Sequence, residues 1–205
     1  AIAGGRLVPV ERRFTTQTAL EREKRILRIE RDGRGAVQPI LGADEAGARL
    51  QGLSALKYGL ALNGGQEAAG RLLLSSQNRI VAIQGVAGAG KSTMLKPVAD
   101  VLREEGRAVL GLAVQNTLVQ MLERDTGIAS MTVARFLKRH AVLLEGGDSA
   151  RLSTARTAMR GTIVLLDEAS MVGNADKEKL VRLANLLELD RFASIGDRKQ
   201  LGAVD

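Results

Sequence analysis

The pattern of apolar positions changes near Arg79. Before it, apolar side chains are interspersed among many charged ones; after it, short, nearly continuous apolar runs alternate with longer mixed segments. Alternation of this kind, with room for a helix between successive runs, is typical of a parallel sheet with helices on both faces. The predicted fold class is therefore α/β, with strands at Ile80–Gln84, Ala108–Val114, Thr162–Leu166 and Phe192–Ile195.

The first part of the chain predicts a charged helix. Thr18 and Glu21 have the spacing of a capping box, and the helix is expected to continue to Asp32, where Gly33 and Gly35 follow. Its sides are mostly polar, which favours an extended arm over a core helix. We therefore interpret residues 1–60 as an N-terminal helical arm or linker segment, and residues 61–205 as the main domain.

Two further helices are expected before the first strand. One begins near Asp44, and the other spans about Gly64–Ser75 with Asn63 as its N-cap. The spacing of leucines in the first of these helices indicates the side that faces the core. The residues predicted to face inward are Leu50, Leu53 and either Leu56 or Leu60.

Composition narrows the function classes. The 205 residues contain no Cys and one His, which excludes disulfides, thiolate metal sites and His-rich metal sites. No apolar run is long enough to span a membrane and no signal peptide is visible, so the cytoplasm is the expected compartment. The net charge of +7 favours a polyanionic partner, and residues 1–60, with 11 basic against 7 acidic residues, carry over half of it.

A phosphate-binding motif follows the first predicted strand. Residues 85–92 read GVAGAGKS, which matches the P-loop pattern G-x-x-x-x-G-K-[ST] between a strand and a helix. Small residues let backbone N–H groups surround phosphates, Lys91 reaches the β- and γ-phosphates, and the Ser92 hydroxyl can bind Mg²⁺. The competing interpretation is a glycine-rich turn that binds nothing. The residues predicted to contact ATP here are Gly85, Gly88, Ala89, Gly90, Lys91, Ser92 and Thr93.

Two carboxylates follow the third predicted strand. The run Val164-Leu165-Leu166 brings Asp167 and Glu168 to a strand's carboxyl end, where ligands bind in open α/β sheets. Asp167 is the predicted Mg²⁺ partner through water, and Glu168 the predicted base that orients the attacking water. The alternative is that Asp167 only caps the next turn. A P-loop about 75 residues earlier favours the catalytic interpretation.

Three stretches resemble motifs of superfamily 1B helicases. Residues 167–174 (DEASMVGN) resemble their Walker B motif, and residues 196–201 (GDRKQL) resemble their motif III. Gln66 stands where these helicases keep an adenine-reading glutamine. Together with Ile83-Gln84-Gly85, these stretches resemble the first RecA-like domain of conjugative relaxase–helicases of the TraI/TrwC type. The resemblance covers about residues 62–205.

The resemblance implies further roles. Gln66 would bind adenine through its amide, and Gln200 would act catalytically by sensing the γ-phosphate and coupling it to DNA. Either residue could instead be a surface glutamine of a helix or a loop. Thr132 would contact DNA in motif Ib, or act as a plain helix N-cap. Gln115 stands where these helicases usually have a Thr that contacts a DNA phosphate, and it could make the same contact. Asn116, the next residue, is a further candidate DNA contact.

The resemblance also implies a larger parent. It would be an ATP-dependent 5′→3′ helicase that moves on single-stranded DNA in conjugative transfer, with ATP and Mg²⁺ as cofactors. Its expected partners are single-stranded DNA, a second RecA-like domain, a relaxase domain and the conjugative transfer machinery. This chain alone would bind Mg-ATP and hydrolyse it poorly. Two alternatives are a vestigial module that only binds DNA or proteins, and an unrelated P-loop NTPase.

Overall fold

A five-stranded parallel sheet forms the centre of the protein, in the order β3-β7-β6-β4-β5. The computed structural model describes residues 2–3, 6–7, 17–85, 90–146 and 148–196. The predicted α/β class is confirmed, and two strands keep their predicted bounds. The strands are β3 (Ile80–Gln84), β4 (Ala108–Ala113), β5 (Ser130–Thr132), β6 (Thr162–Leu166) and β7 (Arg191–Gly196), and a two-residue hairpin pairs β1 (Ile2–Ala3) with β2 (Arg6–Leu7).

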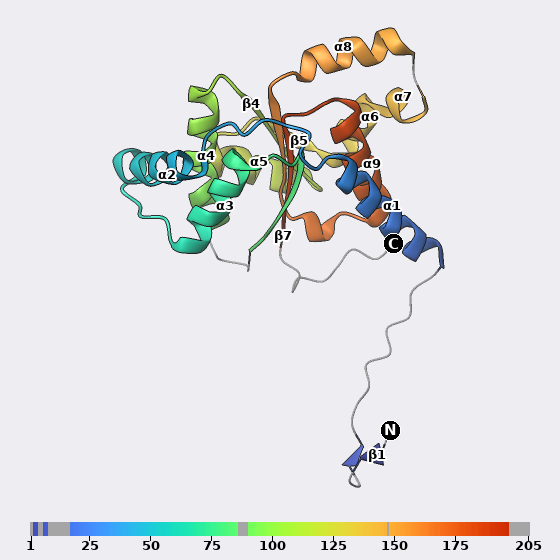
Figure 1. The fold of residues 1–205 in the computed structure, drawn as a ribbon, viewed down its shortest axis with the longest axis horizontal. Coiled ribbons are helices and arrows are strands. Elements are labelled where there is room, and N and C mark those ends of the chain that lie inside the picture. Colours follow the sequence, from blue (N-terminus) through green and yellow to red (C-terminus); the bar gives the residue numbers. More distant parts are fainter. Residues whose placement is uncertain (1, 4–5, 8–16, 86–89, 147, 197–205) are drawn as a thin grey trace.

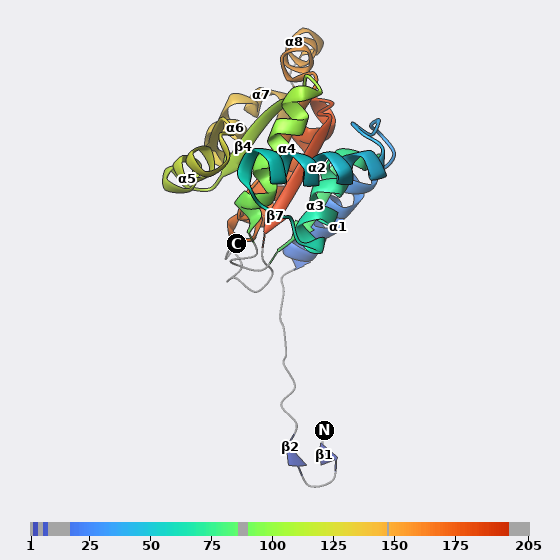
Figure 2. The same cartoon turned by 90° about the vertical axis from the view of Figure 1, so that its left-hand side faces the viewer.

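Helices cover both faces of this sheet (Figures 1 and 2). One face packs on α2 (Ala43–Tyr58), α3 (Gly64–Ser75), α4 (Lys91–Glu104) and α5 (Asn116–Thr126). The other packs on α1 (Gln17–Asp32), α6 (Val133–Arg139), α7 (Ala141–Leu144) and α9 (Asn174–Leu186). Alternate residues of β6 divide between these two cores, which is why this central strand is apolar from Ile163 to Leu166.

Helix α8 (Ser149–Met159), like α1, has no fully buried residue, although Leu152, Ala155 and Met159 pack against the core. Figure 1 shows it beyond the end of the sheet opposite the carboxyl ends of β3 and β7. Asp148 caps its start by accepting a hydrogen bond from the Arg151 N–H at 2.7 Å. None of the helices described is long and apolar enough to cross a bilayer.

The first 60 residues reach both faces of the sheet. Helix α1 lies on α9, where the Arg25 Nε donates to Glu178 Oε1 at 2.7 Å and Asn185 donates to the Ile29 carbonyl at 2.9 Å. The chain then passes the amino end of β3, where the Arg79 N–H donates to the Gly33 carbonyl at 2.8 Å. On the opposite face, α2 buries Leu50 completely.

Two local predictions in this region are wrong. Thr18 lies inside α1, which begins at Gln17, so it does not cap the helix. Leu56 is 88% exposed and Leu60 is 42% exposed. The inward face of α2 instead follows the i, i+4 row from Ala46 through Leu50, and a residue six positions beyond Leu50 points well away from that row. The predicted cap of α3 is observed, because the Asn63 side chain accepts from the Gln66 N–H.

Candidate nucleotide site

The P-loop motif joins the end of β3 to the start of α4. Gly90 has φ +70°, a backbone conformation that favours glycine, and a Cβ there would displace the end of the Gln66 side chain. Helix α4 begins directly afterwards, which places Lys91, Ser92 and Thr93 in its first turn. Gly88 and Ala89 lie outside the described residues. A helix that opens in this way directs backbone N–H groups toward a bound anion.

Lys91 links the P-loop helix to the two predicted carboxylates. Its ammonium donates to Glu168 Oε1, and it lies 3.6 Å from Asp167 Oδ1, although Glu168 is 77 positions away in the chain. All three side chains are largely shielded, with 16–22% of their surface exposed. The fold therefore brings the cation and both acids of the predicted site together.

Strand β6 delivers the two acids in different ways. The Asp167 N–H donates to the Leu112 carbonyl at 2.9 Å, which extends the ladder to β4 by one residue. Glu168 then adopts φ +47°, an unusual conformation for a residue with a side chain, and the 3₁₀ turn Ala169–Met171 follows. This turn sends Glu168 away from the line of the strand and toward Lys91.

Three oxygen atoms in this region are buried without a hydrogen-bond partner among the described residues. They are Asp167 Oδ1, Glu168 Oε2 and Ser170 Oγ. Burial raises the pKa of Asp167, and its effect outweighs the opposing charge of Lys91. Unpartnered acceptors at a phosphate-binding turn suit a hydrated divalent cation, because Mg²⁺ prefers oxygen ligands and keeps several waters. Asp167 and the hydroxyl of Ser92 therefore fit an Mg²⁺ site.

The end of β7 closes the site from the other side. The Gly85 N–H donates to the Gly196 carbonyl at 3.1 Å. A Cβ on Gly196 would lie 3.1 Å from the Ser170 backbone nitrogen and 3.2 Å from that of Ala169, so only glycine fits there without a shift. The predicted motif III thus begins in contact with the turn that follows Glu168. Gln200 lies outside the described residues.

Gln66 lies at the edge of the same region. Its Oε1 accepts from the Asn63 N–H at 3.0 Å, and its Nε2 donates to the Gly90 carbonyl at 3.2 Å. It lines a cavity of about 230 Å³ together with Lys91 and Met94. Gln66 is therefore beside the P-loop, as an adenine-binding residue would have to be, and its binding role stays a prediction.

The predicted DNA contacts lie at the carboxyl ends of the neighbouring strands β4 and β5. Gln115 and Asn116 are exposed two and three residues beyond Ala113, whose register partner is Thr132. Thr132 acts as the N-cap of α6, because its hydroxyl accepts from the Arg135 N–H at 3.2 Å. Phe136 and Phe192 are each 2% exposed, so both are core residues.

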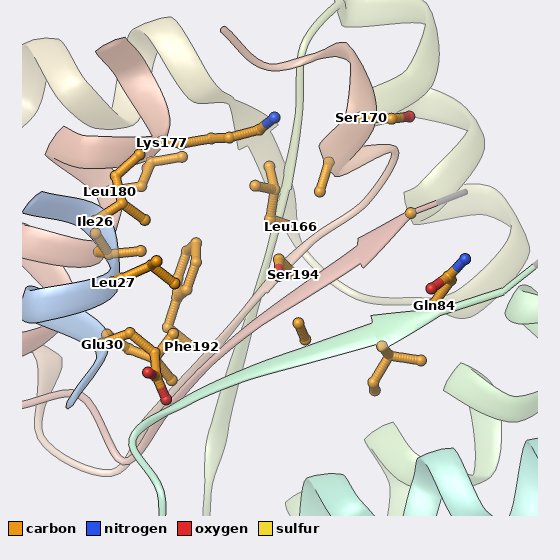
Figure 3. Close-up of a pocket in the computed structure, with 16 residues that line it drawn as sticks. Ile26, Leu27, Glu30, Gln84, Leu166, Ser170, Lys177, Leu180, Phe192 and Ser194 are labelled. Atoms are coloured by element: carbon orange, nitrogen blue, oxygen red, sulfur yellow. The ribbon is translucent and has the colours of Figure 1, made fainter. Parts of the chain in front are cut away.

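An apolar pocket beside the site was not predicted. It has a volume of about 560 Å³ and lies between α1, α9 and the sheet, with Ile26, Leu27, Leu180 and Phe192 among its lining residues (Figure 3). Gln84 and Ser170 form its boundary toward the nucleotide site. Sequence reasoning could have found Ser170, which lies two residues after Glu168, but the pocket depends on α1 packing against α9.

The sheet, the P-loop connection and the paired acids define a P-loop nucleotide-binding domain of the α/β class. The AAA domain family matches residues 61–205, and the chain belongs to that family. The predicted resemblance to conjugative relaxase–helicases is likewise confirmed by the relatives described next.

Curated relatives come from conjugation systems. The multifunctional conjugation protein TraI of Escherichia coli (strain K12) is 32% identical over 195 residues, which cover 93% of this chain and 10% of TraI. The probable conjugal transfer protein TraA of Sinorhizobium fredii (strain NBRC 101917 / NGR234) is 29% identical, over 64% of this chain and 11% of TraA. The chain thus spans about a tenth of the length of these relatives. The crystal structure of Pif1 helicase from Candida albicans aligns with a TM-score of 0.46 and 22% identity, covering 71% of this chain and 34% of Pif1.

Proposed function

We propose that this chain is the ATP-binding part of a larger conjugative helicase, in which ATP binding and hydrolysis drive movement along single-stranded DNA. The contact of Lys91 with both Asp167 and Glu168 carries the proposal. It unites a P-loop lysine with two acids at the carboxyl ends of the strands, the arrangement that phosphoryl transfer to water requires. Glycine at 196 lets the end of β7 lie against the turn that follows Glu168.

Each residue has a separate task in the proposed reaction. Backbone N–H groups at the start of α4 and the Lys91 ammonium would hold the phosphates. Asp167 and Ser92 would hold Mg²⁺, which would neutralise part of the phosphate charge. Glu168 would orient the attacking water and accept its proton. Gln66 would bind adenine, and Gln200 would sense the γ-phosphate.

The remaining parts of the proposal depend on the relatives. A second RecA-like domain and a relaxase domain would belong to the same parent protein, with the conjugative machinery as a partner and the cytoplasm as its compartment. Translocation would run 5′→3′. Gln115, Asn116 and Thr132 would contact the DNA strand. The isolated chain would bind Mg-ATP weakly and hydrolyse it slowly, because an arginine from another domain can contribute about 10³–10⁵ in rate.

Calorimetry with Mg-ATP tests the nucleotide site. Lys91→Ala should abolish binding, because it removes the cation that the phosphates require. Lys96→Ala is the matched control, since it removes a lysine from the same helix, where Lys96 lies over the ring of Tyr58. It should leave the affinity for Mg-ATP unchanged. Equal affinity in the Lys91→Ala variant and the wild type would refute the P-loop assignment.

A further inference from the structure

Helix α6 presents three basic side chains on one side. Val133, Phe136 and Leu137 are buried in the core, and His140 behind them is also buried. Arg135, Lys138 and Arg139 are exposed, and their spacing of i, i+3 and i+4 places them together on the opposite side of the helix. We call these three residues the α6 basic stripe. It begins three residues beyond Thr132.

No carboxylate neutralises the α6 basic stripe within the described part of the chain. Between Asp125 and Glu145 the sequence contains no Asp or Glu at all. Helix α9 packs against α6, but its Asp176 pairs with Lys179 and its Glu178 pairs with Arg25. The other elements in contact with α6, which are β4, β5 and α7, carry no acidic residue.

The nearest acids in sequence are also occupied. Glu123 on α5 accepts a hydrogen bond from the Ser130 N–H at 2.9 Å, and Asp125 pairs with Arg124 at 2.8 Å. The three cations of the stripe therefore add to one another at the side of the sheet where β5 is the edge strand. An uncompensated local charge of this kind attracts a polyanion.

From this arrangement, and resting on the proposed function, we infer that the α6 basic stripe binds the phosphate backbone of single-stranded DNA. It continues the line from Gln115 and Asn116, at the start of α5, through Thr132. The stripe offers no aromatic ring for base stacking, because Phe136 is buried on the opposite side of α6. Its contacts are therefore to phosphates, and its contribution does not depend on base sequence.

The test measures how salt changes the affinity for labelled single strands. Each phosphate contact on a single strand contributes about 0.7 to the slope of log affinity against log salt. The triple variant Arg135→Ala, Lys138→Ala and Arg139→Ala should therefore lower the slope by about 2, and the affinity by roughly 100-fold at 0.1 M salt if the affinities converge near 1 M. The loss should be the same for oligo-dT and oligo-dA.

Helix α1 supplies a matched control. Lys24, Arg28 and Arg31 are also exposed and without an ion pair among the described residues, but Glu21, Glu23, Glu30 and Asp32 lie on the same helix. Changing these three cations to Ala removes the same charge from the opposite side of α9. This variant should keep nearly all of the affinity for single strands. An equal loss in both triple variants would overturn the inference, because it would reflect net charge alone.

Two further measurements separate a loss of the stripe's charges from a loss of the fold. The variant Arg135→Lys, Lys138→Arg and Arg139→Lys retains the charges and should restore most of the affinity. Mg-ATP binding by the α6 triple variant reports whether the nucleotide site and the fold are intact. If the wild type binds Mg-ATP and single strands while the α6 variant binds both equally well, the inference fails and the proposed function stands. If the wild type binds neither, both fail.

Discussion

The two ends of the central sheet both bury charge, but they satisfy it differently. At the amino end, Arg191 is completely buried, and its guanidinium donates to the carbonyls of Ser76 and Leu72. Arg79 donates nearby to the Leu189 carbonyl at 3.0 Å. At the carboxyl end, Lys91 contacts Asp167 and Glu168, and acceptor oxygens remain without a partner among the described residues.

The buried side-chain atoms that lack a hydrogen-bond partner differ in kind between the two ends of the sheet. The unpartnered atoms at the amino end are donors, the Nε atoms of Arg191 and Arg107, in side chains that tie elements together. At the carboxyl end they are oxygens of Asp167, Glu168 and Ser170. Only acceptors can receive a metal ion or its waters, so the carboxyl end alone is built for a cation.

The largest effect is expected at Glu168. Glu168→Gln should lower single-turnover ATP hydrolysis by about 10²–10⁴, because an amide cannot accept the proton of the attacking water. Mg-ATP affinity should hold or increase, since Lys91 loses a carboxylate that competes with phosphate. Glu188→Gln is the matched control: Glu188 also has positive φ and pairs with Arg156 at the amino end. Hydrolysis by the Glu168→Gln variant at the wild-type rate would remove Glu168 from the mechanism.

Arg191→Ala should lower the free energy of unfolding by about 3 kcal/mol. The change leaves a cavity and removes the guanidinium that donates to the Ser76 carbonyl, while the Leu72 carbonyl still accepts from the Ser76 N–H. Burial lowers the pKa of Arg191 to about 10, so the residue is still charged at neutral pH, and urea unfolding at pH 7 tests the protonated form. Arg160→Ala, at an exposed arginine, should change the unfolding midpoint very little.

Nucleotide affinity then separates the two ends. In folded Arg191→Ala protein, Mg-ATP binding should stay within about twofold of the wild type, because Arg191 takes no part in the proposed phosphate contacts. A large loss of affinity without a loss of stability would show that the amino end belongs to the functional site. The division between structural donors and functional acceptors would then be wrong.

The sequence was informative where the cause is local. Strands β3 and β6 keep their predicted bounds because they are short apolar runs between polar residues. Strand β5 was missed because its three residues, Ser130–Thr132, form no such run and depend on pairing with β4. Lys91 and Asp167 were predicted from the spacing of residues in their motifs, because that spacing follows from the local geometry that phosphate and Mg²⁺ binding require.

Interactions between distant segments were not visible in the sequence. The contact of Arg25 with Glu178 joins residues 153 positions apart, and it holds a helix that was expected to be an arm against α9. The polar surface of α1 concealed Ile26 and Ile29, which pack against the core on that face. The ion pair between Arg25 and Glu178 holds α1 on α9, although the apolar pattern of α1 alone does not predict this packing.

A smaller effect is expected at Gly196. Gly196→Ala should cost about 1–2 kcal/mol of stability, because its Cβ would press on the backbone nitrogens of Ala169 and Ser170, which cannot rotate away. Hydrolysis should also fall, since the displaced turn carries Glu168. Gly52→Ala on α2 is a control of opposite sign. A Cβ there meets open space, so helix propensity should raise stability by roughly 0.5–1 kcal/mol. Unchanged stability and rate in Gly196→Ala would mean that this close approach has no role.

The smallest effect on stability is expected at Asp167, and it tests the carboxyl end of the sheet most directly. Because burial raises the pKa of Asp167, its charged form is less favourable in the folded chain than in the unfolded one. Asp167→Asn should therefore raise the metal-free unfolding free energy at pH 7. The gain should disappear as pH falls below the raised pKa and then through the ordinary value of 3.8, because Asp167 itself becomes neutral. The variant should also lose the stabilisation that Mg-ATP gives the wild type.

Asp100→Asn should show the reverse pH dependence. Burial raises the pKa of Asp100, but hydrogen bonds from Lys57 and Tyr58 lower it further, so its charged form stabilises the fold. That stability is present above pH 3.8 and is lost as pH falls through the lowered pKa, so Asp100→Asn should be destabilising at pH 7. Urea unfolding from pH 3 to 8 compares the two variants. If Asp167→Asn destabilises the metal-free protein as Asp100→Asn does, Asp167 stabilises the fold itself, and the carboxyl end of the sheet is not a preformed cation site.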